Sequence, residues 1–302
     1  MSGAAATRAG SARGAAEALL WLIPAVWSSN YLIARAGAEW VTPHLLAFGR
    51  WGLVFAVLLA FCAPGLWRRR ACLRREAGQL LVLGALGMWI CGAWVYLGGR
   101  TTTATNMALI YACAPIGIAI GGRRLLGERG GSPAQVVATA AAVLGVLLVV
   151  MRGDPRNLMS LRFSAGDLWI VAATGSWIGY SLLLQVWKTG LRPLERLCAT
   201  AGGGLVVMLP FAAWEWQSLQ APLAPEAWQL IGLAALLPGL VAYAAYGFLQ
   251  RELGVTRTAL AMYLAPIYGG LLAWGLLGEV PRWYHLAGAG LIIPGIYLAR
   301  SR

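Results

Sequence analysis

Polar and aromatic side chains recur at helical spacing inside long apolar stretches of this sequence. Residues three, four or seven positions apart share one face of a helix. The stretch that begins near residue 15 places four such residues on one face: Pro24, Trp27, Asn30 and Tyr31. Amide, phenol and indole groups form hydrogen bonds and stack against rings, and this stripe contains no carboxylate, histidine or cysteine. This pattern favours binding of a small organic solute over catalysis.

Other apolar stretches carry similar groups, and polar groups in hydrocarbon are expected to face a bundle interior or a water-filled cavity. The candidate substrate-binding residues are Trp27, Asn30, Tyr31, Trp89, Tyr96, Asn106, Tyr111, Trp177, Tyr180, Tyr243 and Tyr246. The alternative is that the rings only pack helices together. For the two asparagines, that alternative is an interhelical hydrogen bond, typically worth about 0.6 kcal/mol.

Catalytic and metal-binding patterns are missing from the sequence. Its two histidines, His44 and His285, share no predicted helix, its five cysteines have no metal-ligand spacing, and it contains no Gly-rich phosphate loop. We therefore expect no catalytic residue, no metal and no cofactor, and we do not expect an enzyme. An integral-membrane enzyme or a channel is the alternative from a different class.

The composition is that of a membrane protein, because 59% of the residues are hydrophobic and only 12% are charged. A membrane-spanning helix needs about 20 predominantly apolar residues. Arginine clusters and turn residues divide the chain into ten such stretches, at residues 15–35, 43–66, 77–98, 102–122, 133–151, 167–187, 193–213, 227–249, 256–277 and 283–300. We predict an all-α integral membrane protein with ten transmembrane helices.

Two segments of the chain resemble one another. Residues 104–128 read ATNMALIYACAPIGIAIGGRRLLGE, and residues 255–279, 151 positions later, read VTRTALAMYLAPIYGGLLAWGLLGE. Such similarity indicates duplication. Five spans per copy insert the second copy upside down, and inverted repeats are typical of secondary transporters that open a midplane site to each side in turn. The predicted organisation is a cytoplasmic arm (1–14), a first repeat (15–151), a connecting loop (152–166) and a second repeat (167–300).

The net charge of +13 is explained by membrane topology. Most of the 24 Lys and Arg residues fall in loops on the same side as the termini, and cytoplasmic loops carry such an excess. Both termini are therefore predicted to be cytoplasmic. The basic residues gather on no single soluble face, so we expect no nucleic-acid partner.

A few further residues bear on energy coupling and on conformational change. Acidic residues fall near span ends, at Glu17, Glu76, Glu128, Asp167, Glu195 and Glu279. A proton-coupled transporter usually carries a relay of Asp, Glu or His residues inside the membrane, so the pattern favours an uncoupled facilitator. Proton-coupled export of another small metabolite is the alternative.

Arg50 lies inside a span, where we favour a structural role over binding of a substrate carboxylate. Pro115 and Pro266 occupy matching mid-helix positions and are hinge candidates, unless they serve only close packing.

These residues also carry a resemblance to a known family. The segment Trp27-Ser28-Ser29-Asn30-Tyr31, its counterpart Trp177-Ile178-Gly179-Tyr180, the span containing Arg50, and the paired proline spans ending in Leu-Gly-Glu resemble the drug/metabolite transporter superfamily. The resemblance covers nearly the whole chain and is closest to the ten-helix EamA-type members, in particular bacterial aromatic amino acid exporters. It implies a multi-pass protein of the bacterial cytoplasmic (inner) membrane.

The combined prediction is a secondary transporter that exports amino acids, above all aromatic and other large neutral ones, from the cytoplasm by alternating access. Its partners are then the small-molecule substrate and membrane lipid. The sequence leaves open the substrate range, the coupling, the most stable conformation and the oligomeric state, although a monomer is compatible with every feature above.

Overall fold

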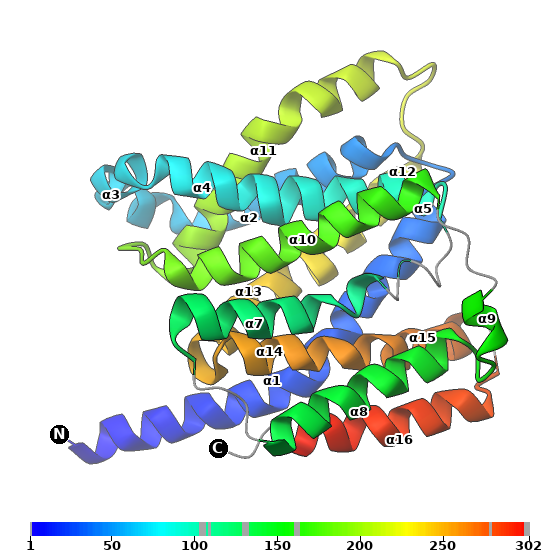
Figure 1. Cartoon of the computed structure of the whole chain (residues 1–302). Helices are drawn as coiled ribbons and strands as arrows, with labels where there is room; N and C mark the ends of the chain where they lie inside the picture. Colours follow the sequence, from blue (N-terminus) through cyan, green and yellow to red (C-terminus); the bar gives the residue numbers. More distant parts are fainter. Residues whose placement is uncertain are drawn as a thin grey trace. The chain divides into compact units, whose positions relative to one another are not determined.

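The computed structural model describes residues 2–102, 107, 110–128, 133–159, 164–277 and 280–298. Within these ranges the secondary structure is entirely helical (Figure 1), which confirms the all-α prediction. Asn106, the side chain of Tyr31, and Glu279 lie outside the described residues.

The first half of the chain contains α1 (Ser2–Gly37), α2 (Pro43–Arg68), α3 (Arg70–Arg75), α4 (Ala77–Gly84), the π-helix η1 (Ala85–Trp94), α5 (Val95–Gly99), α7 (Ala114–Leu126) and α8 (Pro133–Val150). The second half contains α9 (Arg156–Met159), α10 (Ala165–Val186), α11 (Pro193–Gln217), α12 (Pro225–Ala234), the π-helix η2 (Ala235–Val241), α13 (Ala242–Leu253), α14 (Val255–Leu260), the 3₁₀ helix η3 (Ala261–Leu264), α15 (Ala265–Leu277) and α16 (Trp283–Leu298).

Among the described residues, five helical stretches are long and apolar enough to cross a membrane: Pro43–Arg68, Ala77–Gly99, Ala165–Val186, Pro193–Gln217 and Pro225–Leu253. They correspond to the second, third, sixth, seventh and eighth predicted spans, and helices lie within the other five predicted spans as well. One difference concerns the N-terminal arm, because α1 already begins at Ser2. Alanine is the strongest helix former, and this segment is rich in it.

Contacts along the chain separate it into two compact units. Unit 1 comprises Met1–Ser29, Pro115–Leu161 and Ala245–Arg302, and unit 2 comprises Asn30–Ala114 and Arg162–Ala244. Each unit contains segments from both halves of the sequence.

In unit 2, α2 packs along α11, and α11 also contacts α4 and η1. Glycines bring α4 and α11 close together: a Cβ atom added to Gly84 would lie 2.2 Å from the backbone nitrogen of Gly204. Small residues at such crossings let helix backbones approach each other in membranes. The helix α10 packs against η1 and α5, and η2 packs against α2.

Both ends of the α2–α11 pair are held by charged side chains. At one end, Glu215 of α11 accepts hydrogen bonds from the backbone of His44 (2.9 Å) and Leu45 (3.0 Å) and lies 2.7 Å from Nδ1 of His44. At the other end, Arg69 lies 2.8 Å from Glu195 of α11. The first turn of each helix thus contacts the last residues of its partner, as expected for antiparallel spans.

In unit 1, α8 and α16 lie side by side (Figure 1). Glycines again set the spacing, since a Cβ atom at Gly145 would lie 2.7 Å from the carbonyl oxygen of Gly288. Glu128, at the end of the first repeated segment, accepts hydrogen bonds from the backbone of Val255 (2.9 Å) and from the Thr256 hydroxyl, and so holds the start of α14.

The hinge candidates lie where the helical structure of each span changes. Pro115 is the second residue of α7, after a turn at residues 112–113, and Pro266 is the second residue of α15, after the 3₁₀ helix η3. A proline in the first helical turn has no N–H group to leave unpaired and meets no preceding carbonyl. Two turn residues thus precede α7, and a 3₁₀ helix leads without interruption into α15, so that the helix type changes just before each proline.

Candidate substrate site

A buried arginine lies at the centre of the polar contacts in unit 2. The residues of α2 that face the protein interior include Ala47, Arg50, Trp51, Val54 and Leu58, at the three- and four-residue spacing of one helix face. Arg50 lies on this mostly apolar face and is therefore buried with it, so that only 4% of the residue is exposed.

The Arg50 guanidinium contacts three other helices of the chain. Nη1 donates to Oδ1 of Asn30 (3.3 Å) and to the hydroxyl of Tyr96 (3.4 Å), and Nη2 donates to the carbonyl oxygen of Pro238 in η2 (2.8 Å). The Tyr96 hydroxyl in turn donates to Oδ1 of Asn30 (2.9 Å). Asn30 and Tyr96, both predicted from the sequence, therefore meet at Arg50.

All of these hydrogen-bond partners are neutral. Among the described residues, the ion pairs are His44–Glu215, Arg69–Glu195, Arg75–Glu76 and Arg257–Glu17, and none involves Arg50. Within the part of the chain that the structure describes, Nε of Arg50 has no hydrogen-bond partner, and neither has the buried indole nitrogen of Trp51. Two neighbouring residues thus present N–H donors without acceptors, and a buried cation lacks a counter-charge.

Aromatic rings surround the Arg50 region. The rings of Trp51, Trp177, Tyr180 and Tyr243 form what we call the Tyr243 cluster. Its centre is Tyr243, whose ring centroid lies 4.7 Å from that of Trp51, 5.7 Å from that of Trp177 and 5.8 Å from that of Tyr180. Cζ of Arg50 lies 5.0 Å from the Trp51 ring centroid and 5.9 Å from the Tyr243 ring centroid, within the range of cation–π attraction.

The two π-helices supply backbone carbonyl groups to this region. The Tyr243 hydroxyl donates to the carbonyl oxygen of Gly87 in η1 (2.7 Å), as Arg50 donates to that of Pro238 in η2. Ser176 of α10 donates to the neighbouring Leu86 carbonyl (2.7 Å). π-Helical turns are rare and occur frequently at functional sites. Here each of them offers a main-chain oxygen to a side chain of another helix.

The remaining predicted residues lie elsewhere. The Trp89 ring stacks on Phe211 at 4.6 Å, which in turn stacks on His44 at 5.4 Å, near the end of α2. The hydroxyl of Tyr111 hydrogen-bonds to the thiol of Cys91. Asn106 and the Tyr31 side chain lie outside the described residues.

A separate contact involves Trp27 and Tyr246, two candidate substrate-binding residues that belong to unit 1. The rings of Trp27 and Tyr246 meet edge to face, with centroids 5.1 Å apart. Next to Trp27, the Ser28 hydroxyl lies 3.0 Å from the carbonyl oxygen of Ala265, directly before Pro266. The predicted set therefore divides between the two units.

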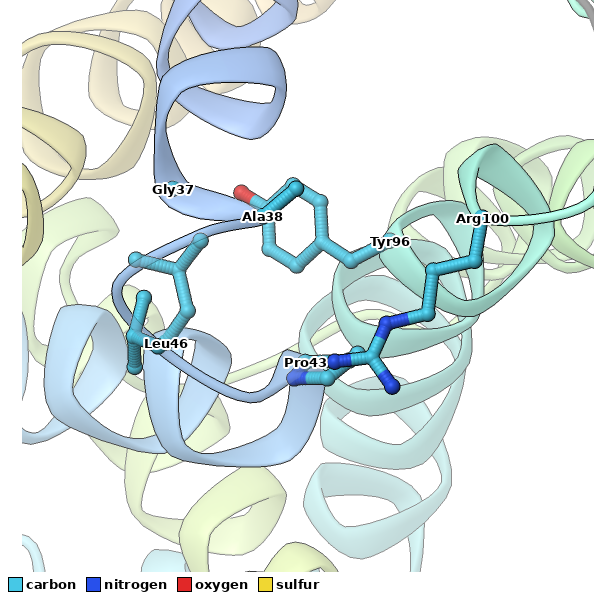
Figure 2. A pocket seen from close by; sticks show the side chains of 7 residues that line it. Gly37, Ala38, Pro43, Leu46, Tyr96 and Arg100 are labelled. Atoms are coloured by element: carbon cyan, nitrogen blue, oxygen red, sulfur yellow. The ribbon is translucent and has the colours of Figure 1, made fainter. Parts of the chain in front are cut away.

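Open space next to the Arg50 network is small. Tyr96 lines a pocket of about 20 Å³ together with Arg100 and residues from the start of α2, and Figure 2 shows its ring beside the chain at Gly37 and Ala38. This volume suits a single water molecule. A larger groove of about 550 Å³ runs along α2, α11 and α12, but its lining is almost wholly apolar. The Arg50 network itself is closely packed in this conformation.

Comparison with known proteins identifies the class of protein. The sequence profile of the EamA-like transporter family matches the chain twice, over residues 15–151 and 164–301. The chain belongs to this family, and thus to the drug/metabolite transporter superfamily that the motifs resembled. It is a multi-pass membrane protein of a transporter family.

Individual relatives are distant but cover most of the chain. A probable terminal-alkyne amino-acid exporter of Streptantibioticus cattleyicolor is 26% identical, covering 94% of this chain and 92% of the relative. A probable amino-acid metabolite efflux pump of Salmonella typhimurium is 24% identical, covering 93% of both. An uncharacterized Bacillus subtilis transporter, YyaM, is 25% identical, covering 90% of this chain and 88% of the relative.

A solved crystal structure supports the fold. It superposes with a TM-score of 0.71 at 20% sequence identity, and the match covers 93% of this chain and 95% of that chain. At this identity the likeness concerns the fold alone.

Sequence reasoning missed two features of the Arg50 region. Trp51 was not singled out, because it lies in an apolar stretch and does not belong to a polar stripe. The π-helices also went unnoticed, although Gly87 and Pro238 are separated by the same 151 positions as the repeated segments. That equal spacing between two helix-weakening residues was the available signal.

Proposed function

We propose that this protein exports amino acids from the cytoplasm by alternating access, with aromatic and other large neutral amino acids as its substrates. The substrate site in this proposal is formed by the Tyr243 cluster and the polar groups at Arg50. The observation that carries it is the burial of an uncompensated cation beside a cluster of four aromatic rings, inside spans where polar groups are costly.

The chemistry of the site matches this class of solute. Rings and small residues offer stacking and apolar contact to a large side chain. The hydroxyl, amide and guanidinium groups offer directed hydrogen bonds to the polar part of an amino acid. One relative is named as a probable terminal-alkyne amino-acid exporter and another as a probable amino-acid metabolite efflux pump, which agrees with this choice. Two chlamydial relatives are named as S-adenosylmethionine/S-adenosylhomocysteine transporters. These larger amino-acid derivatives should therefore be included among the solutes tested.

Alternating access is supported by the repeated architecture. The second span packs against the seventh and the fifth against the tenth, so that two of the spans in each half meet their copies from the other half. A pseudo-symmetric arrangement of inverted repeats can close one side of a central site while it opens the other. With both termini cytoplasmic, the direction of net movement follows the substrate gradient, which is outward when the amino acid accumulates in the cell.

A second candidate function is proton-coupled export, and one contact favours it. His44 and Glu215 are both buried and lie 2.7 Å apart between α2 and α11. Histidine and carboxylate side chains within membrane spans are the residue types that form proton relays in pumps and transporters. We favour the uncoupled mechanism, because this pair lies at the ends of α2 and α11, and its hydrogen bonds join these two ends.

The test is transport by purified protein in liposomes. Vesicles loaded with phenylalanine, tryptophan, leucine or methionine should show saturable counterflow, whereas aspartate, lysine and glucose should not. Trp177→Ala should reduce the rate strongly, while Trp214→Ala, which changes an exposed tryptophan of α11, should not. Lack of counterflow for every amino acid would reject the proposed function. A rate that depends on a pH gradient, and loses this dependence in His44→Gln, would favour the coupled alternative.

A further inference from the structure

The geometry points to separate binding groups for the two charges of an α-amino acid. Arg50 binds the carboxylate and releases the carbonyl oxygen of Pro238, and this oxygen then binds the ammonium group. This inference rests on the proposed function and adds which atoms recognise the solute. It predicts that the transporter requires both charged groups of a zwitterion.

The first argument is the excess of donors. Nε of Arg50 and the indole N–H of Trp51 have no acceptor within the described structure, and both residues are almost completely buried. Unpaired buried donors are costly. Both are satisfied by oxygen atoms, and a carboxylate supplies two oxygens together with the negative charge that Arg50 lacks.

The second argument concerns the edge of the guanidinium group. Arginine binds carboxylates most strongly through two parallel N–H donors. Nη1 is occupied by Asn30 and Tyr96, so that the remaining edge consists of Nε and Nη2. Nε is unpaired, and Nη2 is bound only to the Pro238 carbonyl. A carboxylate that takes this edge displaces one main-chain oxygen and breaks no ion pair.

The third argument is the fate of that oxygen. Pro238 lies within η2, and its released carbonyl needs a new donor because buried backbone oxygens are nearly always paired. The ammonium group of an α-amino acid lies next to its carboxylate and can serve as this donor. The zwitterion therefore replaces both halves of the Arg50–Pro238 hydrogen bond, which a simple carboxylate or a simple amine cannot do.

Two glycines lie next to the unpaired donors. A Cβ atom on Gly239 would lie 3.5 Å from Nε of Arg50, and one on Gly92 would lie 3.6 Å from the indole nitrogen of Trp51. Gly239 is itself closely packed, since its Cβ would also lie 2.9 Å from the carbonyl oxygen of Ala234 and 2.9 Å from the Val54 side chain. The Arg50 network is therefore closed in this conformation, and the exchange belongs to a more open state of the alternating-access cycle. Cζ of Arg50 lies 5.9 Å from the Tyr243 ring centroid, so the side chain of a bound amino acid is within reach of the Tyr243 cluster.

The test is competition for binding of radiolabelled phenylalanine to the full-length protein in nanodiscs. The competitors are phenylalanine, its methyl ester, 3-phenylpropanoate and 2-phenylethylamine. The wild-type protein should prefer phenylalanine over each of the other three by about 10-fold or more, the value of a hydrogen bond to a charged group. Equal affinity for phenylalanine and for either the ester or the amine would overturn the inference.

Variants show whether Arg50 is responsible for this preference. In Arg50→Gln, phenylalanine affinity should fall about 10-fold or more, while the affinity of the methyl ester and of 2-phenylethylamine stays unchanged. Trp51→Phe should show a smaller fall in the same direction. Arg69→Gln removes an arginine of the same segment that already has a carboxylate partner, and Trp214→Phe removes an exposed indole N–H, so both should bind like wild type.

The outcomes separate the two proposals. A wild-type protein that binds no amino acid rejects the proposed function, and this inference with it. A wild-type protein that binds phenylalanine, combined with an Arg50→Gln variant that binds it equally well or loses all four compounds alike, rejects only the role of Arg50. If Arg50→Gln does not fold, the wild-type preferences and Trp51→Phe still decide.

Discussion

Gly87 and Pro238 lie 151 positions apart, and each directs its carbonyl oxygen from inside a π-helix to a side chain of another helix. The donor to Gly87 is the Tyr243 hydroxyl, and the donor to Pro238 is Arg50. The two repeats therefore place the same backbone irregularity at the same position, but they satisfy it with different side chains. One of the two donors is neutral and the other charged, so that a charged ligand competes for only one of these hydrogen bonds.

Tyr243→Phe tests the value of the first of these hydrogen bonds. The ring stays in the Tyr243 cluster while the Gly87 carbonyl loses its donor. We expect a loss of about 0.6 to 1.7 kcal/mol in the free energy of unfolding, the range measured for hydrogen bonds between membrane helices. Thermal unfolding in detergent measures it, with the exposed Tyr297→Phe as control. An unchanged melting temperature would show that this hydrogen bond does not stabilise η1.

Asn30→Ala tests the network around Arg50. The substitution removes the oxygen that accepts hydrogen bonds from both Arg50 and Tyr96, so the guanidinium is held less firmly. Transport efficiency in liposomes should fall about 10-fold, as expected for a hydrogen bond to a charged group, while the protein remains monodisperse. Asn157→Ala, which changes an exposed amide, is the control. Normal transport by Asn30→Ala would indicate that Asn30 serves helix packing only.

Pro115→Ala tests the proposed hinge. Alanine permits a continuous helix where the chain now breaks at residues 112–113. Because the change lies outside the Arg50 network, turnover should fall while substrate affinity stays the same. Concentration-dependent efflux separates the two quantities, and Pro266→Ala should behave alike. A change confined to affinity would contradict a hinge role.

The topology predicts where thiols react. In a background without the other native cysteines, Cys72 and a cysteine at Ser2 should be cytoplasmic, and a cysteine at Gln220 should be external. An impermeant maleimide added to intact cells should label only the last. External labelling of position 2 would overturn the predicted orientation.

Glu76 should make stability depend on pH. Its burial opposes ionisation, but hydrogen bonds from Cys72 (2.9 Å), Thr189 (2.5 Å) and the backbone of Gly190 (3.3 Å) hold the pKa of Glu76 below its ordinary value of 4.5. A carboxyl group with a lowered pKa stabilises the fold above the pKa of the unfolded chain, and this contribution is lost as the pH falls through the folded-state pKa. Glu76→Gln should therefore be less stable than wild type at pH 7.

The difference between the two proteins should then shrink below about pH 4.5, where the carboxyl becomes protonated in the unfolded chain and next in the folded protein. Unfolding temperatures from pH 7 to pH 3 measure it. A difference that is independent of pH would indicate that the charge of Glu76 is irrelevant and only its shape matters.

The sequence predicted the all-α fold well, because composition, hydrophobic length and repeats are properties of single segments. It also placed Asn30, Tyr96, Trp177, Tyr180 and Tyr243 among the site candidates. The structure brings the first two to Arg50 and the three others together in the Tyr243 cluster. It did not separate Tyr243 from Tyr246, which share a face by spacing. The first joins the ring cluster of unit 2, and the second packs on Trp27 in unit 1.

This separation depends on which helices lie next to one another, and spacing along one helix carries no such information. The same limit explains why the sequence alone did not identify Trp51 and Glu215. Trp51 is recognisable only through its unpaired indole nitrogen, and Glu215 only through its contact with His44, a residue far away in the sequence.

The most direct measurement of the central claim is a crystal structure of the protein with 4-iodophenylalanine, whose iodine gives an anomalous signal. The account predicts the carboxylate within hydrogen-bond distance of Nε and Nη2 of Arg50, the ammonium group at the Pro238 carbonyl, and the iodine among the rings of the Tyr243 cluster. Iodine density beside Trp27 and Tyr246, or in the apolar groove along α2, α11 and α12, with Arg50 still bound to Pro238, would contradict it.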